Sequence, residues 1–341
     1  MVSANSVLVF SLGLTVGLLV NVSVFNSYGA AGLQVPVKPC NCEPCNCLPC
    51  NCLPCVCTES PQASVPKTPK IGRGLYWFGG DIKNLLLHDD LPKDLKSLPI
   101  VDVGVHDGSD FTLPAARAGH KVYAYEPTGV KYKKILKTLQ SNDIPFTDDL
   151  TAFRRPEAKG VLLRRNVACS GHSGSAMFTT STHGGGVVNS LYSGALPKAD
   201  IAKSVRENVT LVTLSEDLKE EKDGLLLLKM DCQGCEYHGL LGARDYIKSH
   251  KVYVIFLEFF SKGLQAADKQ APERLLDLLT IDLGYQCFDA RSPKHSKEHV
   301  VSGPLSLKDF AAKYHFDERL TKKYGGYGRF TDLLCTKFDL L

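Results

Sequence analysis

The sequence has little excess charge of either sign and no basic block. Its 40 Lys and Arg against 36 Asp and Glu leave a net charge of +4, which is spread along the chain. Binding to a nucleic acid backbone relies on clustered cationic side chains. We therefore predict no nucleic acid partner, and the 44% of hydrophobic residues is typical of a globular protein with a core.

Charge is missing altogether from Ser6 to Phe25. Twenty residues at a helical rise of about 1.5 Å span a bilayer core of about 30 Å. A signal peptide cut near Gly29 stays open as an alternative, but the positive n-region is absent and the apolar run exceeds the usual 7–15 residues or so. We predict that residues 1–31 are a single-pass signal-anchor, with an orientation that the flanking charges leave open.

Histidine and long loops are absent from the tract that holds most of the cysteines. Eight of the 13 cysteines fall between Cys40 and Cys57, in a repeated Pro-Cys-Asn-Cys unit. Zinc sites separate their paired ligands by a larger loop, so a disulfide-linked stalk is favoured over a metal site. The stalk could also link two chains as a disulfide-bonded oligomer. With the Pro-rich linker after it, this segment covers residues 32–70, and the globular domain covers residues 71–341.

The first strong strand pattern lacks the third glycine of a dinucleotide motif. Ile100 to Val103 is a short apolar run, followed by Gly104, Asp107 and Gly108. This pattern predicts a buried strand that enters a tight turn and a helix. The pyrophosphate of a dinucleotide needs G-x-G-x-x-G, and Asp107 would repel phosphate.

A second apolar strand, Val122 to Glu126, ends in an acid about twenty residues later. A carboxylate at this place accepts hydrogen bonds from the two ribose hydroxyls of a nucleoside. S-adenosylmethionine (SAM) has a ribose, no phosphate and a positive sulfonium, so acids around the turn favour it over a nicotinamide dinucleotide. A nucleotide-linked oxidoreductase is the disfavoured alternative.

Further apolar runs predict strands that are buried on both faces of a sheet. Alternation of strands with helical patterns indicates a doubly wound, mostly parallel α/β sheet. The expected strands are 161–163, 166–169, 224–231, 252–260 and 330–337, the last of them antiparallel, and the expected helices are 112–118, 130–141, 237–249 and 274–283.

The middle of the domain is less regular. A glycine-rich loop carries His183, which we predict as a candidate base on a binding lid. Asn208-Val209-Thr210 is an N-glycosylation sequon, usable only if this part of the chain faces the secretory lumen or the cell exterior.

Four motifs in order give the chain a resemblance to the FkbM family of SAM-dependent methyltransferases. They are Val101 to Gly108, Tyr125-Glu126-Pro127, Lys229 to Glu236, and Leu257-Glu258 with the later Gly284-Tyr285. The resemblance implies a Rossmann-like class I methyltransferase fold, SAM as the cofactor and O-methyl transfer.

The resemblance also implies site residues. Asp102, Gly104, Asp107, Gly108 and Glu126 are expected to bind the cofactor. Asp231 is expected to orient or deprotonate the acceptor, and Glu236 and Glu258 are expected to support it or to bind a divalent ion, although no dedicated metal site is predicted.

Two departures from the family pattern concern the loop after Asp231. Gln233 stands where the family usually has Glu. Cys232 and Cys235 form a C-x-x-C that we interpret as packing residues. Two alternatives stay equally open for Glu236: it is an acid of the first helical turn that the helix dipole favours, or it has a direct role in the site.

The resulting hypothesis is a membrane-anchored O-methyltransferase whose catalytic domain faces the lumen of the secretory pathway. Its acceptor is a small molecule or a sugar hydroxyl of a glycan. The alternative hypothesis is a catalytically inactive domain on a stalk that serves adhesion or assembly.

Overall fold

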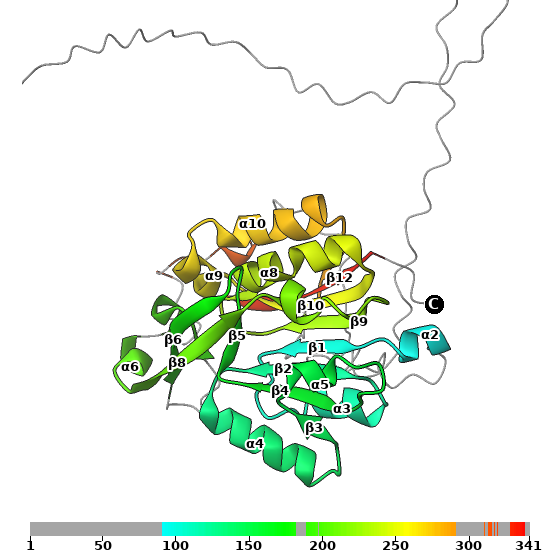
Figure 1. Ribbon diagram of the computed structural model, residues 1–341. Coiled ribbons are helices and arrows are strands. Elements are labelled where there is room, and N and C mark those ends of the chain that lie inside the picture. Colours follow the sequence, from blue (N-terminus) through cyan, green and yellow to red (C-terminus); the bar gives the residue numbers. More distant parts are fainter. Residues whose placement is uncertain are drawn as a thin grey trace, which may run out of the picture. The chain divides into compact units, whose positions relative to one another are not determined.

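The computed structural model describes residues 91–181, 189–196, 198–290, 310, 313–315, 317, 319 and 328–337. An eight-stranded sheet forms the centre of this region, in the order β11-β12-β10-β9-β1-β2-β4-β3 (Figure 1). Its strands are β1 (Ile100–Val103), β2 (Val122–Glu126), β3 (Phe146–Thr147), β4 (Val161–Arg165), β9 (Leu225–Met230), β10 (Val252–Phe260), β11 (Gln286–Asp289) and β12 (Phe330–Thr336).

The sheet is mostly parallel, and its winding reverses once. All neighbouring strands from β3 to β10 pair in parallel, whereas β12 pairs antiparallel with both β10 and β11. The chain passes from β1 outward through β2 to β4, and later from β9 outward to β10. The order therefore reverses between β1 and β9, which makes their carboxyl ends the place where ligands bind in such sheets.

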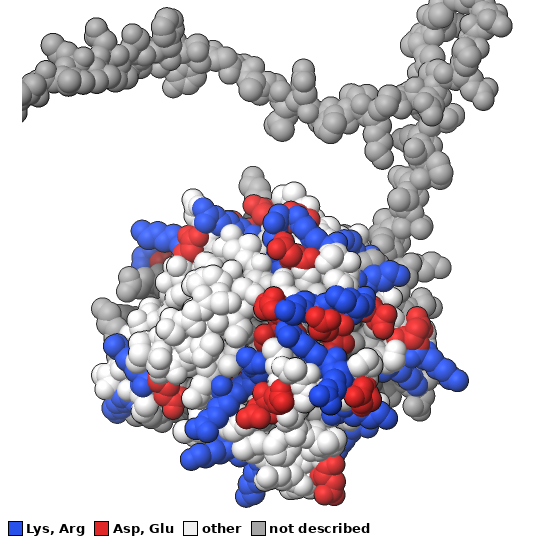
Figure 2. Space-filling view, in the orientation of Figure 1, with Lys and Arg blue, Asp and Glu red and all other residues white. Residues whose placement is uncertain are grey.

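Helices cover both faces of the sheet, because the strands are apolar on both. Alternate residues of β1 belong to different cores: Val101 and Val103 pack with α8 and α10, whereas Ile100 packs with α3 and α4. The helices are α2 (Lys93–Lys96), α3 (Thr112–Arg117), α4 (Gly129–Gln140), α5 (Leu150–Phe153), α7 (Leu214–Asp217), α8 (Glu236–Ser249), α9 (Ser261–Ala267) and α10 (Ala271–Asp277). Acidic and basic side chains are interspersed on the face that Figure 2 shows.

A second, smaller sheet is inserted between β4 and α7. It contains β5 (Val167–Cys169), β6 (Gly174–Ser181), β7 (Asn189–Ser190) and β8 (Ser204–Val212), in the order β5-β8-β6-β7, with the short helices η1 (Ser193–Ala195) and α6 (Lys198–Ile201) beside it. Its own apolar cluster contains Ala168, Phe178, Val209 and Leu211. The sequence pattern indicated β5 but not this sheet.

The structure confirms the predicted parallel core and the antiparallel last strand. The helix expected over residues 274–283 differs: α10 begins at Ala271 and ends at Asp277, and a π-helical turn, η2 (Leu278–Asp282), follows. Within the described residues, no helix is both long and apolar enough to cross a bilayer. The predicted signal-anchor (residues 1–31) and the Cys-rich stalk and linker (residues 32–70) lie outside the described residues.

Candidate functional site

The candidate site lies at the carboxyl edge of the sheet around β1 and β9, where one face of the sheet gathers polar side chains. Asp102 pairs in register with Lys229, Lys229 with Phe256, and Glu258 with Asp332. Residues directly opposite one another in a sheet point to the same face of the sheet. Along one strand, every second residue points to that face. The alternation of the strands therefore brings Asp102, Glu126, Lys229, Glu258 and Asp332 to one face near one edge.

Gly104 sets the separation of β1 and β9 at this edge. Its φ is +82°, and a Cβ placed there would lie 1.8 Å from the carbonyl oxygen of Asp231. The amide of Asp231 donates a 2.9 Å hydrogen bond to the carbonyl of Val103. Only glycine allows this close approach of the two backbones, so Gly104 is required by the sheet itself.

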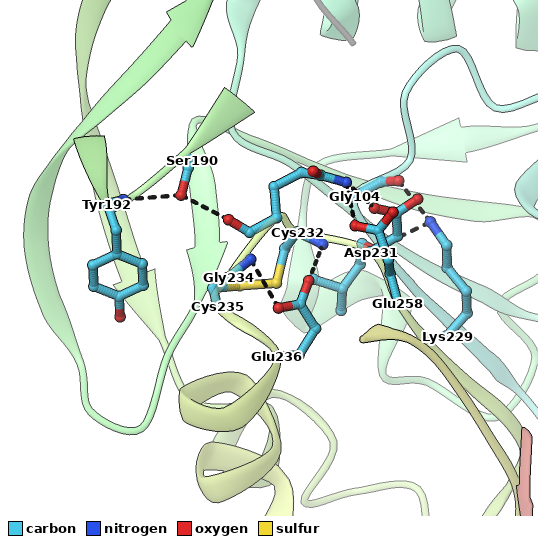
Figure 3. The surroundings of a disulfide bond; sticks show 12 residues. Gly104, Ser190, Tyr192, Lys229, Asp231, Cys232, Gly234, Cys235, Glu236 and Glu258 are labelled. Carbon is cyan, nitrogen blue, oxygen red and sulfur yellow. Dashed lines mark hydrogen bonds between the residues drawn. A yellow bond between two sulfur atoms is a disulfide. The ribbon is translucent and has the colours of Figure 1, made fainter. Parts of the chain in front are cut away.

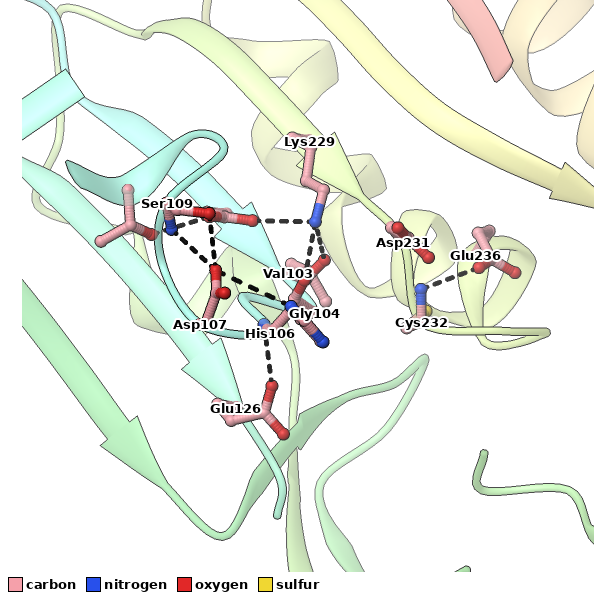
Figure 4. A network of polar contacts seen from close by, with 12 residues as sticks. Val103, Gly104, His106, Asp107, Ser109, Glu126, Lys229, Asp231, Cys232 and Glu236 are labelled. Carbon is pink, nitrogen blue, oxygen red and sulfur yellow. Dashed lines mark hydrogen bonds and ion pairs between the residues drawn. The ribbon is translucent and has the colours of Figure 1, made fainter. Parts of the chain in front are cut away.

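Asp102 is buried and ion-paired instead of open to a ligand. Its side chain is 1% exposed, lies 3.1 Å from Nζ of Lys229 and accepts a 2.7 Å hydrogen bond from the hydroxyl of Thr112. Lys229 also donates to the carbonyl of Gly104 at 2.7 Å (Figure 4). Burial opposes the charge on Lys229, but Asp102 and Asp231 outweigh it and raise the pKa of Lys229. Asp102 thus acts on the glycine turn through Lys229, and direct contact with the cofactor stays a prediction.

The turn after Gly104 is closed by Asp107 and Gly108. A carboxylate oxygen of Asp107 accepts hydrogen bonds from the amide and the hydroxyl of Ser109, at 3.0 and 2.7 Å. Burial works against ionisation here, but these bonds and His106 prevail and lower the pKa of Asp107. Gly108 has a φ of +79°, and its carbonyl accepts the amide of Leu113 at the start of α3. An ionised carboxylate therefore lies on the turn where the cofactor site is predicted.

Glu126 connects the tip of β2 to the same turn. One of its oxygens accepts from the amide and hydroxyl of Thr128, and the other accepts from the amide of His106 at 3.1 Å. Three donors leave about one of the four acceptor positions of a carboxylate open. Burial raises the pKa of Glu126, while Lys131, Thr128 and His106 act against that rise. Asp102 and Glu126 are each bonded to their own neighbours, and the role of Glu126 in holding the ribose stays a prediction.

Asp231 is the exposed acid of the site. It follows β9 directly, and one of its carboxylate oxygens accepts a 2.8 Å hydrogen bond from the side-chain amide of Gln233. The same amide nitrogen donates to Glu258 at the end of β10 (Figure 3). Burial raises the pKa of Glu258 well above its usual range, and Asp231, Glu236 and Asp332 add to the rise. The structure thus brings together two of the predicted catalytic acids through Gln233.

Glu236 is fully buried and holds the loop before α8. Its two oxygens accept from the amides of Cys232 and Gly234, at 2.9 and 2.8 Å. Burial raises the pKa of Glu236 to about 7, although these hydrogen bonds favour the ionised form. A residue in the first turn of a helix makes such contacts when its side chain accepts hydrogen bonds from the loop that precedes the helix. A direct role in catalysis stays a prediction.

The interpretation of Cys232 and Cys235 as packing residues is wrong. The two sulfurs are bonded, across a Cα–Cα distance of 5.4 Å. The turn between them is tight because Gln233 and Gly234 both have positive φ, which brings the two cysteines together. A second disulfide joins Cys287 to Cys335, which are directly opposite in the β11–β12 pair.

Sequence reasoning missed Asp332 and gave no role to Lys229. Asp332 is 6% exposed and faces Glu258 across the β10–β12 pair. An acid inside the apolar run of residues 330–337 was the available clue, but its partner depends on the strand order. His183 lies outside the described residues. Among the described residues, no group of His, Cys, Asp and Glu is arranged to hold a metal ion.

A family model supplies the decisive comparison. The model of the methyltransferase FkbM domain matches residues 102–287, which include the turn after β1, the tip of β2 and the loop after β9. The chain belongs to the FkbM methyltransferase family. It is therefore a SAM-dependent methyltransferase, and SAM is its cofactor.

Solved structures similar to this FkbM methyltransferase are distant. A precorrin-6y C5,15-methyltransferase from Geobacter metallireducens is 11% identical, with a TM-score of 0.32, over 79% of this chain and 93% of that one. A Streptococcus mutans structure described as a methyltransferase, in complex with SAH, is 9% identical, with a TM-score of 0.38, over 77% of this chain and 100% of that one. No curated protein matches the chain.

The donor set of the FkbM methyltransferase suits SAM better than a phosphate-bearing cofactor. The turn after β1 presents the ionised Asp107, and the neighbouring strand tips present Glu126 and Asp231. Carboxylates attract the positive sulfonium and amino groups of SAM and repel phosphate. Glu126 is the residue suited to hold the ribose, and Asp107 and Asp231 the residues suited to face the positive groups.

Proposed function

We propose that this FkbM methyltransferase transfers the methyl group of SAM to a hydroxyl oxygen and that Asp231 is the base. The observation that carries the proposal is the position of Asp231. It is the exposed acid directly after β9, next to the reversal of strand order, and Gln233 fixes one of its oxygens. The other oxygen has no such bond to Gln233 and is suited to accept the proton of a hydroxyl.

The residues of the chain mainly align the reactants. Bound SAM supplies an electrophilic methyl carbon on a positive sulfonium. Glu126 holds the ribose, and the turn from Gly104 to Gly108 shapes the backbone beside it. Asp231 would orient the acceptor hydroxyl and take its proton as the carbon–oxygen bond forms and the carbon–sulfur bond breaks, so that the sulfur leaves as a neutral thioether. Correct alignment alone accounts for much of the rate enhancement in such in-line displacements.

We place the catalytic domain in the lumen of the secretory pathway, anchored by the apolar segment Ser6 to Phe25, with a glycan hydroxyl as the acceptor. Two disulfides within the folded domain, Cys232–Cys235 and Cys287–Cys335, support an oxidising compartment. The exposed sequon residue Asn208 on β8 supports the same compartment. A glycan is a class of hydroxyl-bearing substrate that this compartment offers.

Incubation of the full-length protein with methyl-labelled SAM and a cell extract tests the proposal. Glycans, lipids and small molecules are separated afterwards, and the label is released with mild base to distinguish esters from ethers. We expect base-stable label in the glycan fraction. We expect the amount of transferred label to fall by at least about a hundredfold with Asp231→Asn, which is similar in shape but cannot act as a base. Label on nitrogen or carbon, or full activity of Asp231→Asn, would contradict it.

A further inference from the structure

Gln233 bridges two acids that would otherwise repel each other. Its side-chain nitrogen donates to Asp231 at 2.8 Å and also to Glu258, which lie on different segments, after β9 and at the end of β10 (Figure 3). An amide group carries no charge and presents two N–H donors. Gln233 therefore satisfies both carboxyl groups without adding a third negative charge.

Two contacts constrain the backbone of Gln233, which has an unusual conformation. The disulfide Cys232–Cys235 closes a small ring of chain around it. Its carbonyl accepts a 2.8 Å hydrogen bond from the hydroxyl of the buried Ser190 on β7. Its φ is +58°, a conformation that a non-glycine residue keeps only where its surroundings enforce it.

Charged groups from several elements interact with one another around the bridge. Glu258 comes from β10, Asp332 from β12, Glu236 from α8 and Asp231 from the loop itself. The cations that interact with this group are Lys229 on β9 and Lys131 on α4. Acids outnumber the cations here, so the neutrality of Gln233 matters for the loop.

We propose that Gln233 is a positioning residue that fixes the carboxylate of Asp231 against Glu258, and that the disulfide Cys232–Cys235 keeps Gln233 in place. The assignment of Asp231 as the base rests on the proposed function. The bridge itself is a property of the fold and is testable without an acceptor.

The first test compares Gln233→Glu with the wild-type protein by thermal unfolding of the full-length chain at pH 5.5 and pH 8. The variant has the same shape, but at pH 8 it adds a carboxylate among Asp231, Glu236, Glu258 and Asp332. We expect its Tm to fall about 5 °C further below wild type at pH 8 than at pH 5.5. Gln140→Glu, at the exposed end of α4, is the matched control and should show no such difference. An equal Tm difference at both pH values for Gln233→Glu would overturn the bridge.

The second test repeats the comparison in a Cys232→Ser/Cys235→Ser background. If the disulfide holds Gln233 against the acids, the pH-dependent Tm loss caused by Gln233→Glu should shrink to less than half, because coupled sites are not additive. A Cys287→Ser/Cys335→Ser background, which lacks the other disulfide, should keep the full loss. An undiminished loss without Cys232 and Cys235 would contradict the role of that disulfide.

The third test uses the methyl-transfer assay. Gln233→Ala should lower kcat about tenfold and leave the KM for SAM unchanged. Wild-type kcat in Gln233→Ala would overturn the positioning role. Absence of methyl transfer in the wild type would instead count against the proposed function, while the Tm comparisons still decide on the bridge.

Discussion

Asp332 shows how single residues at the sheet edge depend on their neighbours. It faces Glu258 directly across β10 and β12, and both are buried. Burial raises the pKa of Asp332 to about 8, Asp231 and Asp289 add to the rise, and Lys229 opposes it. The folded state therefore prefers the protonated form of Asp332, whereas the unfolded chain releases the proton near pH 4.

We expect Asp332 to lower the stability of the wild-type protein as the pH rises from about 4 to about 8, because over this range its carboxyl group holds a proton in the folded state and releases it in the unfolded state. Asp332→Asn is neutral throughout and should lose less, so the gap in the free energy of unfolding between the variant and the wild type should change in its favour by about 5 kcal/mol between pH 4 and pH 9. Urea unfolding of the full-length protein measures this gap. The exposed Asp94→Asn is the control. A gap that stays constant with pH would show that Asp332 is ionised in the folded state.

At the scale of elements, the contact between β1 and β9 forms the edge on which the site is built. Gly104→Ala places a methyl group 1.8 Å from the carbonyl oxygen of Asp231 and strains a φ of +82°. Gly119 has a similar φ of +92°, but nothing lies within 4 Å of an added Cβ. The two glycines therefore separate the cost of the clash from the cost of the backbone conformation.

Gly119→Ala should lower the free energy of unfolding by about 1 kcal/mol, the cost of the strained φ. Gly104→Ala should lower it by at least about 2 kcal/mol more, because β1 and β9 must separate. Denaturant unfolding gives both values, and a titration with SAM should show weakened binding for Gly104→Ala alone. Equal losses for the two variants would mean that the sheet edge adapts without cost.

The elements differ in how far the sequence predicts them. Continuous apolar runs such as Leu225 to Met230 predict buried parallel strands, and the acids after them lie at the expected edge. The small sheet was not predicted because β6 alternates weakly and β7 has only two residues. The bridge of Gln233 could not be predicted, because it depends on the order of β9 and β10 in the sheet and on positive φ values that the letters of the sequence do not specify.

At the scale of the whole molecule, the sequon on β8 tests the proposed lumenal compartment. Asn208 and Thr210 are exposed, and Val209 between them is buried in the small sheet. We expect full-length protein from a eukaryotic secretory host to shift to lower apparent mass on treatment with peptide N-glycosidase. Asn208→Gln should abolish the shift and leave the Tm unchanged, because its neighbour Val209 keeps the core contacts. An unmodified Asn208 in membrane-bound protein would count against the proposed lumenal compartment.

The central claim is that SAM binds beside the reversal of strand order, where the turn after β1 contacts the tip of β2. Isothermal titration of the full-length protein with SAM tests it most directly, with Glu126→Ala beside Glu258→Gln. We predict one SAM per chain, an affinity at least about fivefold weaker for Glu126→Ala through lost ribose hydrogen bonds, and an unchanged affinity for Glu258→Gln. Unchanged affinity for Glu126→Ala, with weakened binding for Glu258→Gln, would place the cofactor elsewhere and contradict the account.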